Sequence, residues 1–165
     1  MLRQLCVERV KTAFPGTFAA NSVCFMETLK ENRPMALSVE DNLAIQQLYA
    51  RYNHAIDAGK AAEWAACFTP QGVFDAGATG RFEGTEALSG FATGFAAQLK
   101  ARHWTNNLLL DGDGAAATGS CYLNLLALQA GKPASTIATG IYTDALVKQG
   151  GEWRFSTRTM TADQA

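Results

Sequence analysis

Long apolar runs and an excess of charge of either sign are both missing from this chain of 165 residues. Spanning a bilayer takes about 20 consecutive apolar residues, and no run of that length occurs, so no integral membrane segment is expected. The chain has 14 Lys and Arg against 15 Asp and Glu, which leaves no basic field to hold a polyanion. We therefore expect no membrane partner and no nucleic-acid partner.

Metal-ligand and cofactor motifs are also missing. The chain has only two histidines, and Cys6, Cys24, Cys67 and Cys121 show no CxxC spacing. A domain of this size does not need disulfides, so we interpret the cysteines as free thiols of a cytoplasmic protein. No phosphate-binding loop, dinucleotide fingerprint or serine nucleophile elbow is present. We expect neither a metal nor a cofactor.

The composition fits one ordinary domain, since 48% of the residues are hydrophobic and the length suffices for a core. Residues 1–37 differ in texture, with five basic and three acidic residues against nine and twelve from Ser38 onward. Their apolar residues form no continuous signal-peptide core. We predict a loosely ordered extension over residues 1–37 and a folded domain over residues 38–165.

The periodicity of the apolar residues places helices early and strands late. Ser38, followed by Asp41, has the pattern of a helix start, and an apolar stripe continues to Gly59. Helices are predicted over 38–59, 60–68 and 85–99, and strands over 72–76, 80–83, 102–110, 115–128, 135–148 and 152–161. This order indicates an α+β fold with a bent, mostly antiparallel sheet of about six strands around three helices.

One late strand is apolar on both of its alternating faces, at Cys121 to Leu128. Both faces of such a strand must be covered, and three helices can cover only one side of the sheet. We expect a second copy of the protein on the other side, in a homodimer or small homo-oligomer.

Four stretches, in order and in register, carry a family resemblance: "LYARYNHAIDAGKAAEWAACFTPQGVFDAG", "GRFEGTEALSGF", "RHWTNNLLLDGDGAAATGSCY" and "GIYTDALVKQGGEWRFSTR". From about Ser38 to Thr161 the chain resembles the SnoaL-like branch of the nuclear transport factor 2 superfamily. The resemblance implies a cone in which a bent sheet wraps a long helix and encloses a pocket. The superfamily hosts dehydratases, isomerases, polyketide cyclases and binding domains, so the fold alone does not decide the function.

A dehydratase-type site is the first hypothesis. Histidine titrates near neutrality and can move a proton to or from a substrate. The resemblance implies a pocket histidine at His103, a carboxylate at Asp57 that orients it, and a tyrosine at Tyr52 that polarises a substrate carbonyl. Helix geometry disfavours a site that contains both Tyr52 and Asp57, because the two residues are five positions and about 140° apart on a helix. Asp57 also lies in the last helical turn, where the macrodipole disfavours an anion, so a partner for its charge is expected.

An isomerase-type site is the rival hypothesis. The resemblance places Asp75 where ketosteroid isomerases hold their general base, and Asp144 near their protonated aspartic acid. With Tyr52 as a further donor, this set would support a proton shift beside a carbonyl. It leaves His103 without a role, so we rank it second, beside a third possibility of ligand binding without catalysis.

The predicted pocket is largely apolar and suits a hydrophobic, oxygenated small molecule. Strand alternation puts His103, Thr105, Asn107 and Leu109 on one face. The residues expected to touch the substrate are Asn107, Asp75, Tyr49, Trp64, Phe68, Phe91 and Asp144. The predicted activity is cofactor-independent dehydration.

Overall fold

A computed structural model describes residues 36–163, and these residues form three helices and a single six-stranded sheet. The elements are α1 (Val39–Asp57), α2 (Ala61–Ala65), β1 (Phe68–Asp75), a 3-10 turn (Gly77–Thr79), β2 (Arg81–Glu83), α3 (Gly84–Gln98), β3 (Ala101–Gly112), β4 (Ala116–Ala127), β5 (Ser135–Gln149) and β6 (Glu152–Ala162). The predicted extension over residues 1–37 lies almost entirely outside the described residues and stays a prediction. No helix in the described part of the chain is long and apolar enough to cross a membrane.

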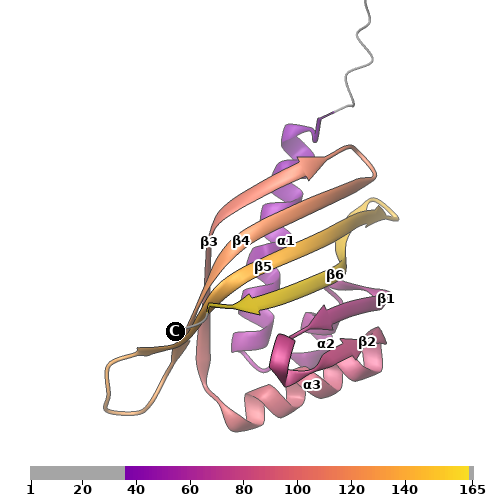
Figure 1. The fold of residues 1–165 in the computed structure, drawn as a ribbon. Helices are drawn as coiled ribbons and strands as arrows, with labels where there is room; N and C mark the ends of the chain where they lie inside the picture. The colour runs from indigo at the N-terminus through magenta and orange to yellow at the C-terminus, as the bar shows by residue number, and fades with distance from the viewer. Residues whose placement is uncertain (1–35, 164–165) are drawn as a thin grey trace, which may run out of the picture. The chain divides into compact units, whose positions relative to one another are not determined.

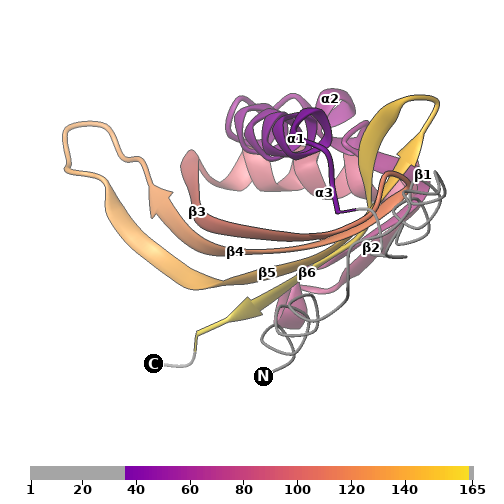
Figure 2. The ribbon, with the colours of Figure 1, turned by 90° about the horizontal axis from the view of Figure 1, so that it is seen from above.

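The sheet has the order β2-β1-β6-β5-β4-β3, and each pair is antiparallel except β1 with β6. Figure 1 shows α1 crossing behind the long strands β3, β4 and β5. In Figure 2 the sheet curves like a trough, and all three helices lie on its concave side. The predicted α+β architecture is confirmed.

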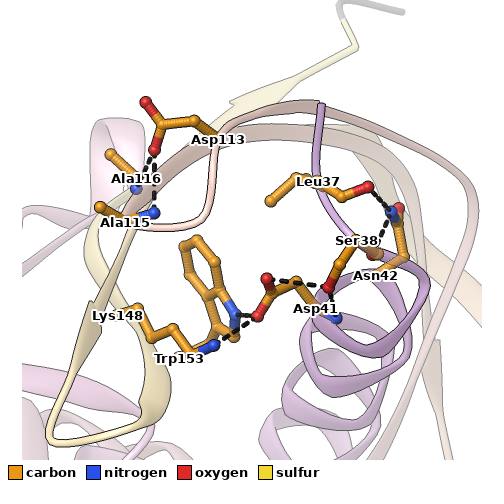
Figure 3. Close-up of polar contacts among 9 residues, drawn as sticks. All are labelled: Leu37, Ser38, Asp41, Asn42, Asp113, Ala115, Ala116, Lys148 and Trp153. Carbon is orange, nitrogen blue, oxygen red and sulfur yellow. Dashed lines mark hydrogen bonds and ion pairs between the residues drawn. The ribbon is translucent and has the colours of Figure 1, made fainter. Parts of the chain in front are cut away.

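The start of α1 follows its sequence signal. Ser38 is the N-cap, and its Oγ accepts a hydrogen bond from the backbone N–H of Asp41 at 3.0 Å. Asp41 in turn accepts hydrogen bonds of 2.7 Å from Lys148 Nζ on β5 and from Trp153 Nε1 on β6, as Figure 3 shows. One carboxylate therefore joins the first turn of α1 to the β5–β6 hairpin.

The core lies between α1 and the sheet and is rich in aromatic rings. Tyr52, Trp64, Phe68 and Phe155 are each at most 2% exposed. The ring of Tyr52 lies 5.2 Å from that of Trp64 and 5.6 Å from that of Phe155, measured between centroids. This packing buries one face of α1, and Asn53 and Asp57 beside that face contact the edge strand β3.

The chain after α2 differs from the prediction. The sequence predicts a helix over 60–68, but α2 ends at Ala65 and β1 already begins at Phe68. Pro70 lies in β1 where its register with β6 shifts between Phe68 and Val73, and an irregular strand position tolerates the missing N–H of proline. The proline signalled a break in the pairing rather than the end of a helix.

A bulge in β3 overturns the predicted face of Asn107. Asn107 has φ +53°, and the pairing with β4 shifts register between Asn106 and Leu109. The extra residue reverses the alternation of side chains. His103 and Thr105 thus face the helices, whereas Asn107 and Leu109 are exposed and Leu108 takes the inward position.

Candidate functional site

A cleft of about 700 Å³ opens between α1 and β3. Helix α1 supplies one wall because its residues four apart share a face, and β3 supplies the other because its residues two apart do so before the bulge. The cleft is lined by Gln46, Tyr49, Ala50, Asn53, His54, Asp57, Ala58, Arg102, His103, Trp104, Thr105, Leu108 and Cys121.

His103 and Asp57 meet in this cleft. The imidazole Nδ1 lies 2.7 Å from Asp57 Oδ1, and the two side chains are 7% and 9% exposed. Both carboxylate oxygens also accept the backbone N–H of His103, at 3.2 Å. The carboxylate therefore binds one ring nitrogen and orients the ring, and Nε2 has no hydrogen-bond partner among residues 36–163. This is the contact that the first hypothesis required, and it supplies the expected partner for the helix-end carboxylate.

Asn53 on α1 and Thr105 on β3 form a second pair beside that of Asp57 and His103. Asn53 Nδ2 donates to Thr105 Oγ1 at 2.7 Å. Asn53 Oδ1 is buried without a hydrogen-bond partner in the described part of the chain. Sequence reasoning singled out neither residue as a ligand contact. The signal was present, since Asn53 precedes Asp57 by one helical turn and Thr105 follows His103 by two strand positions.

Tyr49 reaches the floor of the cleft, but its hydroxyl is engaged elsewhere. It donates to Asp144 Oδ2, and Asp144 holds Arg158 through contacts of 2.8 Å from Nε and 2.7 Å from Nη2. Burial raises the pKa of the Tyr49 phenol. Gly119 makes room for the hydroxyl, because a Cβ there would clash with it. Asp144 is thus the buried partner of Arg158 and does not line the cleft.

Tyr52, the catalytic tyrosine that the resemblance implied, does not line the cleft. Its side chain is 1% exposed and packs against core rings. The Arg158 guanidinium carbon lies 4.3 Å from the centroid of its ring. Tyr52 and Asp57 do not share the cleft because they lie about 140° apart on the helix. Asp57 faces β3, whereas Tyr52 faces the core.

The other expected substrate contacts are also placed away from the cleft. Asp75, at the end of β1, accepts the backbone N–H of Gly77 at 3.0 Å and caps a turn. Trp64, Phe68 and Phe91 pack together in the aromatic core, with centroids 5.1 Å apart for Trp64 and Phe68 and 5.5 Å for Trp64 and Phe91. Asn107 is exposed within the bulge. Of the seven expected substrate contacts, only Tyr49 lines the cleft.

The lining of the cleft is more polar than predicted. Seven of its residues carry polar or charged side chains, namely Gln46, Asn53, His54, Asp57, Arg102, His103 and Thr105. Arg102 Nη1 lies 3.9 Å from Asp57 Oδ2 at the exposed edge. Burial raises the pKa of the Cys121 thiol to about 11, so this cleft residue stays protonated and is a poor nucleophile near neutrality. Within residues 36–163 no three His, Cys, Asp or Glu side chains gather as metal ligands would.

Comparison with known proteins identifies the family. A model of the SnoaL-like domain matches residues 37–159. The chain belongs to the SnoaL-like family. No curated protein matches the chain.

Solved structures agree with the SnoaL-like fold. A Mycobacterium tuberculosis protein of unknown function is 33% identical with a TM-score of 0.72, over 76% of this chain and 73% of that one. A Nostoc punctiforme protein with a cystatin-like fold is 22% identical with a TM-score of 0.72, over 79% and 97% of the two chains. A candidate scytalone dehydratase from Novosphingobium aromaticivorans is 20% identical with a TM-score of 0.68, over 76% and 85%. At these last two identities the likeness shows the fold.

Proposed function

We propose that this SnoaL-like domain is a cofactor-independent dehydratase in which His103 is the general acid and base. The observation that carries the proposal is the 2.7 Å contact between His103 Nδ1 and Asp57 Oδ1 inside the cleft. A carboxylate on Nδ1 fixes the tautomer and leaves Nε2 to exchange a proton with a substrate. The structural similarity to a candidate scytalone dehydratase is consistent with this chemistry.

The proposed reaction needs one shuttled proton. Nε2 of His103 removes the proton from the carbon between a carbonyl group and a carbon that bears a hydroxyl. The electron pair of that C–H bond forms the new C=C bond, and the C–O bond to the hydroxyl breaks. The imidazolium returns the proton to the departing hydroxyl, which leaves as water. Asp57 stabilises the imidazolium between the two transfers.

Tyr52 has no role in this proposal, because its ring lies in the core. The isomerase alternative loses support for the same reason, and also because Asp75 caps a turn and Asp144 is paired with Arg158. The aromatic core packs behind the cleft and takes no part in the chemistry.

The test is turnover of a panel of cyclic β-hydroxy ketones, followed by the absorbance of the conjugated product. General acid–base transfer contributes about 10² to 10⁴ in rate, so His103→Ala should lower kcat by at least about 100-fold while circular dichroism shows an intact fold. Asp57→Asn should lower kcat less, since the ring remains but its tautomer is no longer fixed. Asp75→Asn is the control and should leave kcat unchanged. Loss of activity in Asp75→Asn with full activity in His103→Ala would overturn the proposal.

Binding without catalysis is the second candidate, and one observation favours it. Asp57 also accepts the backbone N–H of His103, as a purely structural tie between α1 and β3 would require. This candidate predicts that panel compounds raise Tm without forming any product. It also predicts that Asp57→Asn lowers Tm and changes nothing else.

A further inference from the structure

Two polar pairs bridge α1 and β3 side by side. The first is Asp57 with His103, and the second is Asn53 with Thr105. Asn53 and Asp57 are one helical turn apart, which is about 6 Å along the helix. Thr105 and His103 are two strand residues apart, which is about 6.5 Å along the strand. The two pairs therefore lie roughly parallel and open onto the same cleft.

The second pair keeps hydrogen-bonding capacity that the protein does not use. Thr105 Oγ1 accepts from Asn53 Nδ2, so the hydroxyl proton of Thr105 is left to donate. Asn53 Oδ1 is buried and has no partner among residues 36–163. A buried acceptor without a partner is destabilising. Because Asn53 lines the cleft, a ligand bound there is the partner that this oxygen lacks.

Two other buried polar groups of the cleft are already engaged, whereas Gln46, His54 and Arg102 are exposed. The Tyr49 hydroxyl donates to Asp144, and the Asp57 carboxylate holds His103. The pair of Asn53 and Thr105 thus combines one free donor with one free acceptor, next to the ring that would move the proton.

We propose that Asn53 and Thr105 bind a second oxygen of the substrate, a hydroxyl that accepts from Thr105 and donates to Asn53. This proposal rests on the proposed function, because it places the reacting part of the substrate at His103. The two pairs are about 6 to 6.5 Å apart along α1 and β3. This separation suits a molecule that carries two oxygens on opposite carbons of one six-membered ring. The substrate class is a ring compound with a hydroxyl opposite its reacting group, which narrows the hydrophobic, oxygenated ligand that the sequence predicts.

Binding of two isosteric probes tests the assignment without requiring turnover. Hydroquinone has two hydroxyls across one ring, and 4-methylphenol has a methyl group in place of the second one. A hydrogen bond of ordinary strength corresponds to a roughly three- to tenfold preference for hydroquinone, measured by ligand-observed NMR titration without oxygen. Thr105→Val and Asn53→Leu should each abolish that preference, and Thr105→Ser should retain it because it keeps the hydroxyl.

The outer face of the sheet supplies a matched control. Thr136 Oγ1 donates to Asn124 Oδ1 at 3.0 Å there, so Asn124→Leu removes the same kind of pair from a surface away from the cleft. It should leave the preference unchanged.

Three results would overturn the proposal: no preference in the wild type, a preference that survives both Thr105→Val and Asn53→Leu, or no binding of either probe at millimolar concentration. A preference without turnover of any panel compound would instead retain this pair as a binding site and remove the proposed catalysis.

Discussion

At the scale of single residues, the guanidinium of Arg158 is a charged group enclosed by aromatic rings. Its side chain is fully buried, and its carbon lies 4.1 to 4.7 Å from the ring centroids of Tyr49, Tyr52, Tyr142 and Phe155. Arginine stays charged in proteins, and the Asp144 carboxylate together with these ring faces compensates for its lost hydration. The hydroxyl of Tyr49 connects this ion pair to the floor of the cleft.

Asp144→Asn should therefore be among the most destabilising conservative substitutions in the domain. Removing one partner of a buried ion pair leaves an uncompensated charge and costs about 3–5 kcal/mol. Urea unfolding followed by tryptophan fluorescence would measure the loss. Asp111→Asn removes an exposed carboxylate from β3 and should change the free energy of unfolding by less than about 0.5 kcal/mol. Similar changes in the free energy of unfolding for the two variants would show that the pair of Asp144 and Arg158 does not stabilise the fold.

The contact between His103 and Asp57 could be predicted from the sequence and the family resemblance, but the buried position of Tyr52 could not. The strand position of His103 and the unfavourable helix-end position of Asp57 are local properties, and each one pointed to a polar partner. The position of Tyr52 depends on which face of α1 the aromatic core occupies, which is a property of the whole fold. The separation of about 140° between Tyr52 and Asp57 predicts that the two side chains lie on different faces of α1, as the structure has them.

At the scale of elements, the first turn of α1 is tied to the sheet by Asp41. Hydrogen bonds from Lys148 and then Trp153 lower the pKa of this carboxyl to about 2 from its ordinary value of 3.8. A carboxyl with a lowered pKa in the folded state contributes stability above its unfolded pKa. That contribution is lost as the pH falls from about 4 to about 2.

We predict that Asp41→Asn flattens the pH dependence of stability in this window. Urea midpoints measured between pH 5 and pH 2 should fall less steeply in the variant than in the wild type. The slope of the free energy of unfolding against pH reports the difference in bound protons between the unfolded and folded states, and the variant should lower that difference by up to one proton per molecule. The variant should also be less stable at neutral pH. Lys148→Met removes the strongest cause of the lowered pKa and should reduce the same slope in part. An unchanged slope in both variants would show that Asp41 titrates normally.

The bulge in β3 decides which residues of this strand face the cleft. Before it, His103 and Thr105 point inward, and after it Leu108 does so. Strict alternation from the sequence could not reveal this, because the extra residue at Asn107 becomes visible only through the pairing with β4. The central strands, where the pairing is regular over most of its length, followed their predicted bounds within a few residues.

Asn107 should tolerate glycine and resist a β-branched residue. Its φ of +53° lies in the left-handed region, which asparagine and glycine adopt more easily than other residues. Asn107→Val should therefore destabilise the domain by about 1–2 kcal/mol, and Asn107→Gly should change stability little. Equal urea midpoints for the two variants would contradict the bulge.

At the scale of the whole molecule, the outer face of the sheet is unusually apolar. The three helices of the described residues lie on the concave side (Figure 2), so the opposite side has no cover within this part of the chain. Trp104 is 60% exposed, Leu109 74% and Tyr122 54%. Ile141 pairs directly with Tyr122 across β4 and β5 and extends the same surface. Exposed apolar patches of this kind mark interaction surfaces.

We predict that a second copy of the chain covers this face, as the two-sided apolar pattern of residues 121–128 indicated. The patch runs over adjacent strands and is bordered by threonines such as Thr139 and Thr143. Two copies related by a twofold axis can therefore bury the same patch against each other. Light scattering at tens of micromolar should give the mass of a dimer or small oligomer for the wild type. Tyr122→Lys combined with Ile141→Lys should shift it to the monomer, because two desolvated charges would face each other across the axis. Leu43→Lys changes an equally exposed apolar residue on α1 and should leave the mass unchanged. A monomeric wild type would contradict the prediction, and so would equal effects of the sheet and helix substitutions.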